Sequence, residues 1–209
     1  MSGLREVGTE TGMAWGRNKD VLLCILVASS CAVAALLGWT TGIHWLADFG
    51  RPGHPTQSIT AWSYLLLSLA LTAGLAERRW VLLTLVAPPV LIAASILIGH
   101  ATELKPLSWG MTLLGAQAPE LPTVAAAIEI LLLAGGIASS DPRHRKRGQL
   151  TVLLASLALA IGVTSIAAIA FVGVGDPMLH YFVKALPTAI ASAALSIALL
   201  IRCKEAGWP

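Results

Sequence analysis

Hydrophobic residues in this chain gather in six long runs, and short polar connections separate the runs. Runs such as VLLCILVASSCAVAALL, at residues 21–37, do not alternate polar and apolar positions, so they predict helices and not strands. A helix needs about 20 residues to cross the hydrocarbon core of a bilayer. The predicted spans are residues 21–42, 59–76, 80–99, 121–138, 150–173 and 182–201.

Composition agrees with this pattern. Of the 209 residues, 56% are hydrophobic and only 12% are charged, whereas soluble domains carry about 25% charged residues. The chain is therefore predicted to be an all-α integral membrane protein. Residues 21–202 form its membrane domain, between an N-terminal segment at 1–20 and a short tail at 203–209.

The runs also repeat. Thr60, Thr123 and Thr188 open SITAWSYLLLSLALTAG, LPTVAAAIEILLLAGG and LPTAIASAALSIALLI, and they follow one another at intervals of 63 and 65 residues. We expect three repeated helical hairpins, in which the second helix of each begins at the threonine. A threonine hydroxyl at that place can cap the free backbone N–H groups of the first turn.

The basic residues predict the orientation. Eleven lysines and arginines fall in the termini and in the connections on one side, whereas Arg51, Lys105 and Lys184 are the only ones on the other. The positive-inside rule then places both termini in the cytoplasm. We interpret these residues as topology signals and expect no nucleic-acid partner, although the net charge is +3.

Helices that return as Thr-Ala followed by a Leu/Ala-rich run are found in ITAWSYLLLSLALTAGL, PTVAAAIEILLLAGG and PTAIASAALSIALLI. With LLGWTTGIHWL after the first span, this pattern resembles the multi-pass N-terminal membrane sensor region (MASE-type) of bacterial sensor histidine kinases and diguanylate cyclases. The resemblance covers about residues 21–202. It implies a sensor of the bacterial inner membrane, and because the output domain of those proteins is absent here, it implies a separate signalling partner.

Glu129 is an ionisable residue near the middle of a span. Intramembrane acids usually face the bundle interior and mark functional sites. Glu129, with Thr60, Thr123 and Thr188, is our candidate contact for a ligand or a partner. The alternative is a protonated carboxyl group that hydrogen-bonds to a hydroxyl of a neighbouring helix.

Metal binding is a further hypothesis. His44, His100 and His180 lie on the predicted external side and could ligate a metal ion, and His44 with His100 could ligate a haem. No HxxxH or HExxH spacing joins any two of them, so no cofactor is predicted. Pro88 and Pro89 lie inside the third span, which we expect to bend or open there.

Two function classes follow. The first is a non-enzymatic sensory or interaction module that binds a small apolar ligand or another membrane protein and acts through a separate partner. The second is a membrane subunit or carrier with a redox or transport role, based on the external histidines or on Glu129. The sequence has no phosphate-binding loop and no serine elbow, so we expect no enzyme.

Overall fold

A computed structural model of the chain describes residues 18–49, 56–102, 122–140, 145–171 and 185–207. These residues are 90% helical and include no strand. Five of their helices are long and apolar enough to cross a membrane: α2 (Lys19–Thr41), α4 (Ser58–Leu75), α5 (Arg79–Thr102), α8 (Arg145–Phe171) and α9 (Leu186–Glu205). The prediction of an all-helical chain with several helices able to span a membrane is confirmed, whereas the six spans and the three repeated hairpins stay a prediction.

The apolar helix α7 (Val124–Ser139) covers most of the predicted span at 121–138 but has only 16 residues. At 1.5 Å per residue it is about 24 Å long, less than the hydrocarbon core of about 30 Å. A short helix α3 (His44–Asp48) follows α2. Gly38 allows α3 to lie against α2, because a Cβ at Gly38 would meet the Ala47 backbone nitrogen at 2.8 Å.

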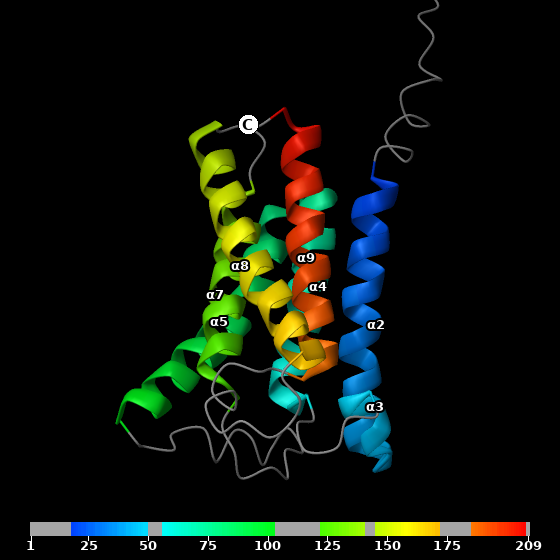
Figure 1. The fold of residues 1–209 in the computed structure, drawn as a ribbon. Helices are drawn as coiled ribbons and strands as arrows, with labels where there is room; N and C mark the ends of the chain where they lie inside the picture. Colours follow the sequence, from blue (N-terminus) through cyan, green and yellow to red (C-terminus); the bar gives the residue numbers. More distant parts are fainter. Residues whose placement is uncertain (1–17, 50–55, 103–121, 141–144, 172–184, 208–209) are drawn as a thin grey trace, which may run out of the picture.

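The long helices and α7 run side by side in one bundle (Figure 1). Around it, α2 packs against α4, α4 against α5, α5 against α7, α7 against α8, α8 against α9, and α9 against α2. The helices α4, α7 and α9 also touch one another, so they form the inner layer. The most apolar stretches of α4 and α9 are 67% and 61% buried, against 22–39% for α2, α5 and α8.

Among the described residues, most of the exposed large apolar side chains belong to the outer helices α2, α5 and α8. Leu26 on α2, Leu91 on α5 and Leu153 on α8 are each more than half exposed. Exposed apolar area of this extent is suited to lipid or to another apolar surface and not to water.

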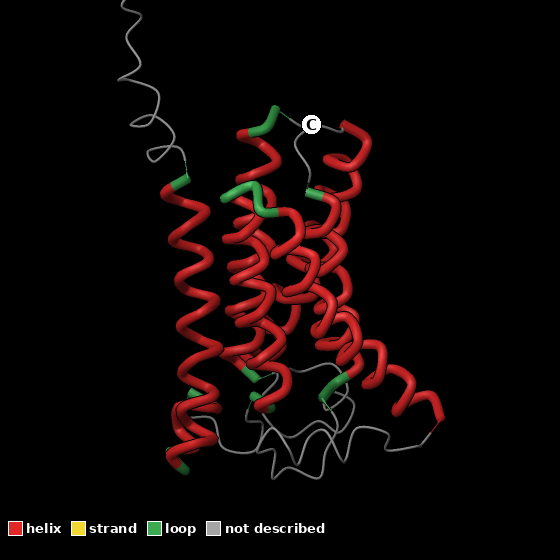
Figure 2. Tube along the Cα trace, turned by 180° about the vertical axis from the view of Figure 1, so that it is seen from behind, coloured by secondary structure: helices red, strands yellow, loops and turns green. Residues whose placement is uncertain are grey.

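The helix α5 continues through Pro88 and Pro89 without a break. Its last turns nevertheless lean away from the bundle, as the lower parts of Figures 1 and 2 show. A proline in a helix removes one backbone donor and crowds the preceding turn, so the helix bends there. The predicted bend is present, and the predicted alternative of an open helix is not.

The prediction that three threonines cap returning helices holds for one of them. Thr123 is the N-cap of α7, and its hydroxyl accepts the Ala126 N–H at 3.2 Å. It is wrong for Thr60 and Thr188, because α4 begins after Gln57 and α9 after Ala185. Pro187 explains part of this shift, since proline fits the first helical turn and lets α9 begin before Thr188.

Candidate functional site

Two polar features lie inside the bundle, and the first is at the level of Glu129. The Glu129 side chain is 0% exposed, and the Tyr64 hydroxyl of α4 donates a hydrogen bond of 2.8 Å to its Oε2. Tyr64 is 1% exposed. A third inner helix, α9, contributes the buried Ser192, whose hydroxyl donates to the Ala189 carbonyl oxygen of its own helix at 3.2 Å.

Gly162 of α8 closes this site. A Cβ at Gly162 would lie 2.8 Å from Ser192 Oγ and 3.3 Å from Glu129 Oε1. The carboxyl group therefore packs directly against the α8 backbone, in space that only glycine leaves. A buried carboxyl group needs such hydrogen-bonding partners, because unpaired polar groups in an apolar interior cost several kcal/mol. We call Tyr64, Glu129, Gly162 and Ser192 the central cluster.

The three predicted contact threonines, Thr60, Thr123 and Thr188, lie in other surroundings. Thr188 is buried and shares a hydrogen bond of 3.1 Å with Thr56. Thr60 is buried in α4, and Thr123 caps α7 as described above. The three threonines therefore have separate local roles in the structure. The prediction that they contact a ligand or a partner stays a prediction.

Of the predicted metal ligands, His180 lies outside the described residues. His44 begins α3, and the His100 Nε2 atom lies 2.9 Å from the Pro122 carbonyl oxygen. Within the described ranges, no group of three or more His, Cys, Asp or Glu side chains could hold a metal ion. The metal hypothesis remains a prediction, because His180 is not described.

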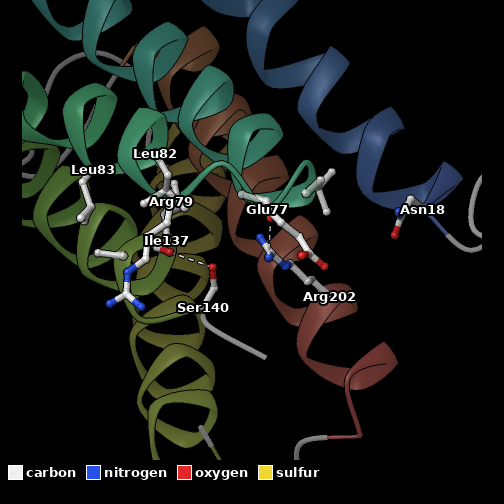
Figure 3. A pocket seen from close by; sticks show the side chains of 11 residues that line it. Asn18, Glu77, Arg79, Leu82, Leu83, Ile137, Ser140 and Arg202 are labelled. Carbon is white, nitrogen blue, oxygen red and sulfur yellow. Dashed lines mark hydrogen bonds between the residues drawn. The ribbon is translucent and has the colours of Figure 1, made fainter. Parts of the chain in front are cut away.

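The second feature is a cavity of about 290 Å³ at the end of the bundle where α4, α7 and α9 finish. Its polar lining includes Glu77, Arg79, Ser140 and Arg202, and its apolar lining includes Leu82. The full lining comprises Asn18, Gly74, Leu75, Glu77, Arg79, Leu82, Leu83, Ile137, Ala138, Ser140 and Arg202. Figure 3 shows Arg79 and Arg202 on opposite sides, with Ser140 between them in this view.

Local geometry fixes Arg202 in this cavity. Its Nη2 donates to the Gly74 carbonyl oxygen at 2.9 Å, which links the end of α9 to the end of α4. A Cβ at Gly74 would meet Arg202 Nη1 at 2.8 Å and Leu82 Cδ1 at 2.9 Å. Glycine at this position is therefore what lets the guanidinium group lie against the α4 backbone.

Glu77 enters the cavity lining from a strained turn. The Arg78 N–H bonds to the Ala73 carbonyl and the Glu77 N–H to the Gly74 carbonyl, which is a Schellman motif that ends α4. The residue with positive φ in this motif is usually glycine, but here Glu77 adopts φ 56°. Such strain in a non-glycine residue often marks a functional position. In Figure 3 the Glu77 side chain lies beside Arg202.

Sequence reasoning identified Glu129 but missed Tyr64, Ser192 and the cavity. One signal was available. Tyr64 and Ser192 each follow a repeat threonine by four residues, so a shared helical position could have suggested that they meet. Comparison of the chain with known protein families, with characterised proteins and with solved structures gave no match.

Proposed function

We propose that this protein is a non-enzymatic sensory or interaction module of the bacterial inner membrane, which acts through a separate partner protein. In this proposal six helices cross the membrane as three repeated hairpins, α2 with α4, α5 with α7 and α8 with α9. Both termini are cytoplasmic. The assignment to a bacterial inner membrane depends on the resemblance to MASE-type sensor regions.

Equivalent burial supports the repeat. Leu67, Ile130 and Leu195 each follow a repeat threonine by seven residues, and all three are 0% exposed. The residues that follow the threonines by eleven positions are also buried to within 1%. The second helix of each hairpin is an inner helix, which explains how the short α7 can cross: its neighbours α5 and α8 cover it from the lipid.

The charge distribution supports the orientation. Lys19 begins α2, Arg78 and Arg79 join α4 to α5, and Arg202 and Lys204 end α9. In Figure 1 the start of α2, the connection from α4 to α5 and the end of α9 lie at the same end of the bundle. Topology reporters fused after residue 20 and at the C-terminus should both report the cytoplasm. A periplasmic signal from either fusion contradicts the proposed orientation.

The cavity is the observation that carries the sensory function. Its lining comes from the ends of α4, α7 and α9, from the start of α5, and from Asn18 before α2. A molecule bound there touches most of the bundle at once, and it favours whichever helix arrangement it fits best. Because the cavity lies at the proposed cytoplasmic end, a change in helix arrangement occurs where a signalling partner can bind.

A filled cavity tests this function. Ala138→Trp places an indole at an exposed lining residue, whereas Ala87→Trp, on the exposed side of α5 and outside the cavity, is the matched control. The full chain is purified from its native membrane in mild detergent and the bound proteins are quantified. We expect one partner at a fixed ratio with the wild type and the control, and several-fold less with Ala138→Trp. Purification without any partner, together with unchanged signalling output after gene deletion, contradicts the proposal.

The central cluster favours a second function, a carrier role that uses Glu129 as a proton site. Buried ionisable residues in membrane spans often belong to proton relays, and Glu129 has a hydroxyl partner on another inner helix. In this case liposomes with the reconstituted protein conduct protons, and Glu129→Gln abolishes the flux while the folded amount stays constant. Equal flux in both proteins excludes this role.

A further inference from the structure

We propose that the cavity at the proposed cytoplasmic end binds the phosphodiester headgroup of a membrane glycerophospholipid, with the phosphate between Arg79 and Arg202 and the acyl chains along α5. The inference rests on the proposed function in one respect, because it takes this cavity as the ligand site of the module. It replaces the expected small apolar ligand with an amphiphile of defined charge.

The lining has the polarity of an amphiphile. Arg79, Ser140, Arg202 and Asn18 supply hydrogen-bonding groups, while Leu75, Leu82, Leu83 and Ile137 supply apolar walls. Leu83 is 39% exposed on α5, so the apolar wall is continuous with the surface that the outer helices present to lipid. A free phosphate ion would leave this wall without an apolar contact.

The net charge of the cavity lining favours a ligand group with one negative charge. The lining includes the guanidinium groups of Arg79 and Arg202 and one carboxylate, that of Glu77, so the formal charges of these three side chains sum to +1. A phosphodiester has a single negative charge, whereas a nucleotide di- or triphosphate has several. Guanidinium groups bind phosphate oxygens with paired N–H donors, and Glu77 lies where it can accept a hydrogen bond from a headgroup amine or hydroxyl.

Arg202 is positioned for this contact. Its bond to the Gly74 carbonyl fixes the guanidinium group at the cavity wall. A guanidinium has five N–H donors, so that bond is compatible with a second acceptor in the cavity. Basic pockets between helices at the cytoplasmic side of a membrane are typical lipid headgroup sites.

The size agrees with a headgroup and not with a whole lipid. Sites for drug-sized molecules measure about 300–1,000 Å³, and this cavity, at about 290 Å³, is at the lower limit. The acyl chains must therefore lie outside it. The exposed apolar side chains of α5 give them a surface: Trp80, Val81, Leu83 and Leu91 are all among the exposed large hydrophobics.

Binding is measured on the full chain in detergent by native mass spectrometry and by thermal stabilisation. The probes are short-chain phosphatidylglycerol, short-chain phosphatidylethanolamine, the matching uncharged diacylglycerol, and inorganic phosphate. We expect both phospholipids to bind, diacylglycerol not to bind, and phosphate to compete only at far higher concentration. Diacylglycerol binding as tightly as the phospholipids overturns the proposal, and so does phosphate binding as tightly as they do.

Variants then locate the site. Loss of a hydrogen bond to a charged group weakens binding about tenfold or more, so Arg79→Gln and Arg202→Gln should each lower phospholipid affinity by that factor. Arg78→Gln is the control, since Arg78 is exposed in the same turn but does not line the cavity. Arg202 bonds to the Gly74 carbonyl oxygen of α4, so Arg202→Gln can disturb the packing of helices, and Arg79→Gln is the second, independent variant. Wild-type affinity in Arg79→Gln overturns the proposal.

This assay is independent of the partner experiment. Phospholipid binding, found together with purification without any partner and an unchanged signalling output after gene deletion, contradicts the proposed function and leaves the lipid site intact. If a partner protein is bound by the wild type and lost in Ala138→Trp, but no phospholipid binds, the proposed function is supported and the lipid site is overturned.

Discussion

The hydrogen bond between Tyr64 and Glu129 joins two inner helices, and its energy can be measured. Tyr64→Phe removes one hydroxyl group and leaves the ring, which is 1% exposed, in its packed position. Hydrogen bonds between transmembrane helices average about 0.6 kcal/mol and reach about 1.7 kcal/mol in double-mutant cycles. Because this bond is short, at 2.8 Å, and completely buried, we expect a coupling energy in the upper half of that range.

The partner substitutions separate the hydrogen bond from packing. Glu129→Gln keeps a side-chain carbonyl oxygen that can accept from the Tyr64 hydroxyl, so Tyr64→Phe should cost as much in this background as in the wild type. Glu129→Leu removes the acceptor. In that background the hydroxyl has lost its partner on α7, and Tyr64→Phe should cost about 1 kcal/mol less than in the wild type.

The measurement is the free energy of unfolding, in bicelles, of all the proteins of the two cycles, for example by steric trapping. Thr84→Val is the control, because the exposed Thr84 hydroxyl donates to the Trp80 and Val81 carbonyl oxygens of its own helix. Its effect should stay within about 0.5 kcal/mol. If Tyr64→Phe costs the same in the wild type and in Glu129→Leu, to within about 0.3 kcal/mol, the pair does not hold α4 to α7.

Three further predictions use the same unfolding assay. Gly162→Ala should lower the free energy of unfolding by about 1–3 kcal/mol through overpacking, since its Cβ would meet Ser192 Oγ at 2.8 Å. The control is Gly135→Ala, whose Cβ meets only the flexible end of a leucine. A smaller cost for Gly162→Ala than for this control contradicts the prediction. Glu77→Gly should stabilise the protein by about 1 kcal/mol, because φ 56° is unfavourable for glutamate. An unchanged or lowered stability shows that the Glu77 carboxylate compensates for the strain. Thr123→Ala should cost about 1 kcal/mol through loss of the N-cap bond, and Thr123→Ser should restore most of it.

The sequence was sufficient for the helices because their signal is local. Each apolar run is long, and lipid leaves a backbone no alternative to internal hydrogen bonds. The helix ends were predicted less accurately, since α8 begins at Arg145 rather than at the predicted residue 150. Charged residues of a first turn lie outside the hydrocarbon region, and apolar periodicity does not detect them.

The contacts between helices could not be read in the same way. Tyr64 and Glu129 are 65 residues apart, and their meeting depends on how α4 and α7 are rotated and shifted relative to each other. Nothing in either segment alone fixes that relation. Arg202 illustrates the same limit: its charge predicted the orientation of the chain, but its bond to Gly74 depends on where two helix ends come together.

The proposed repeat has a different residue type at the same position of each inner helix, where the cavity lies. Gly74, Ile137 and Arg202 each follow a repeat threonine by fourteen residues, and all three line the cavity. If each repeat carried an arginine there, three like charges would meet at the ends of the inner helices and repel one another. Glycine in one repeat gives the single arginine its place and its carbonyl partner, and isoleucine in another gives an apolar wall. In the proposed repeat, a charged site can therefore form at these helix ends only where the three repeats differ in sequence.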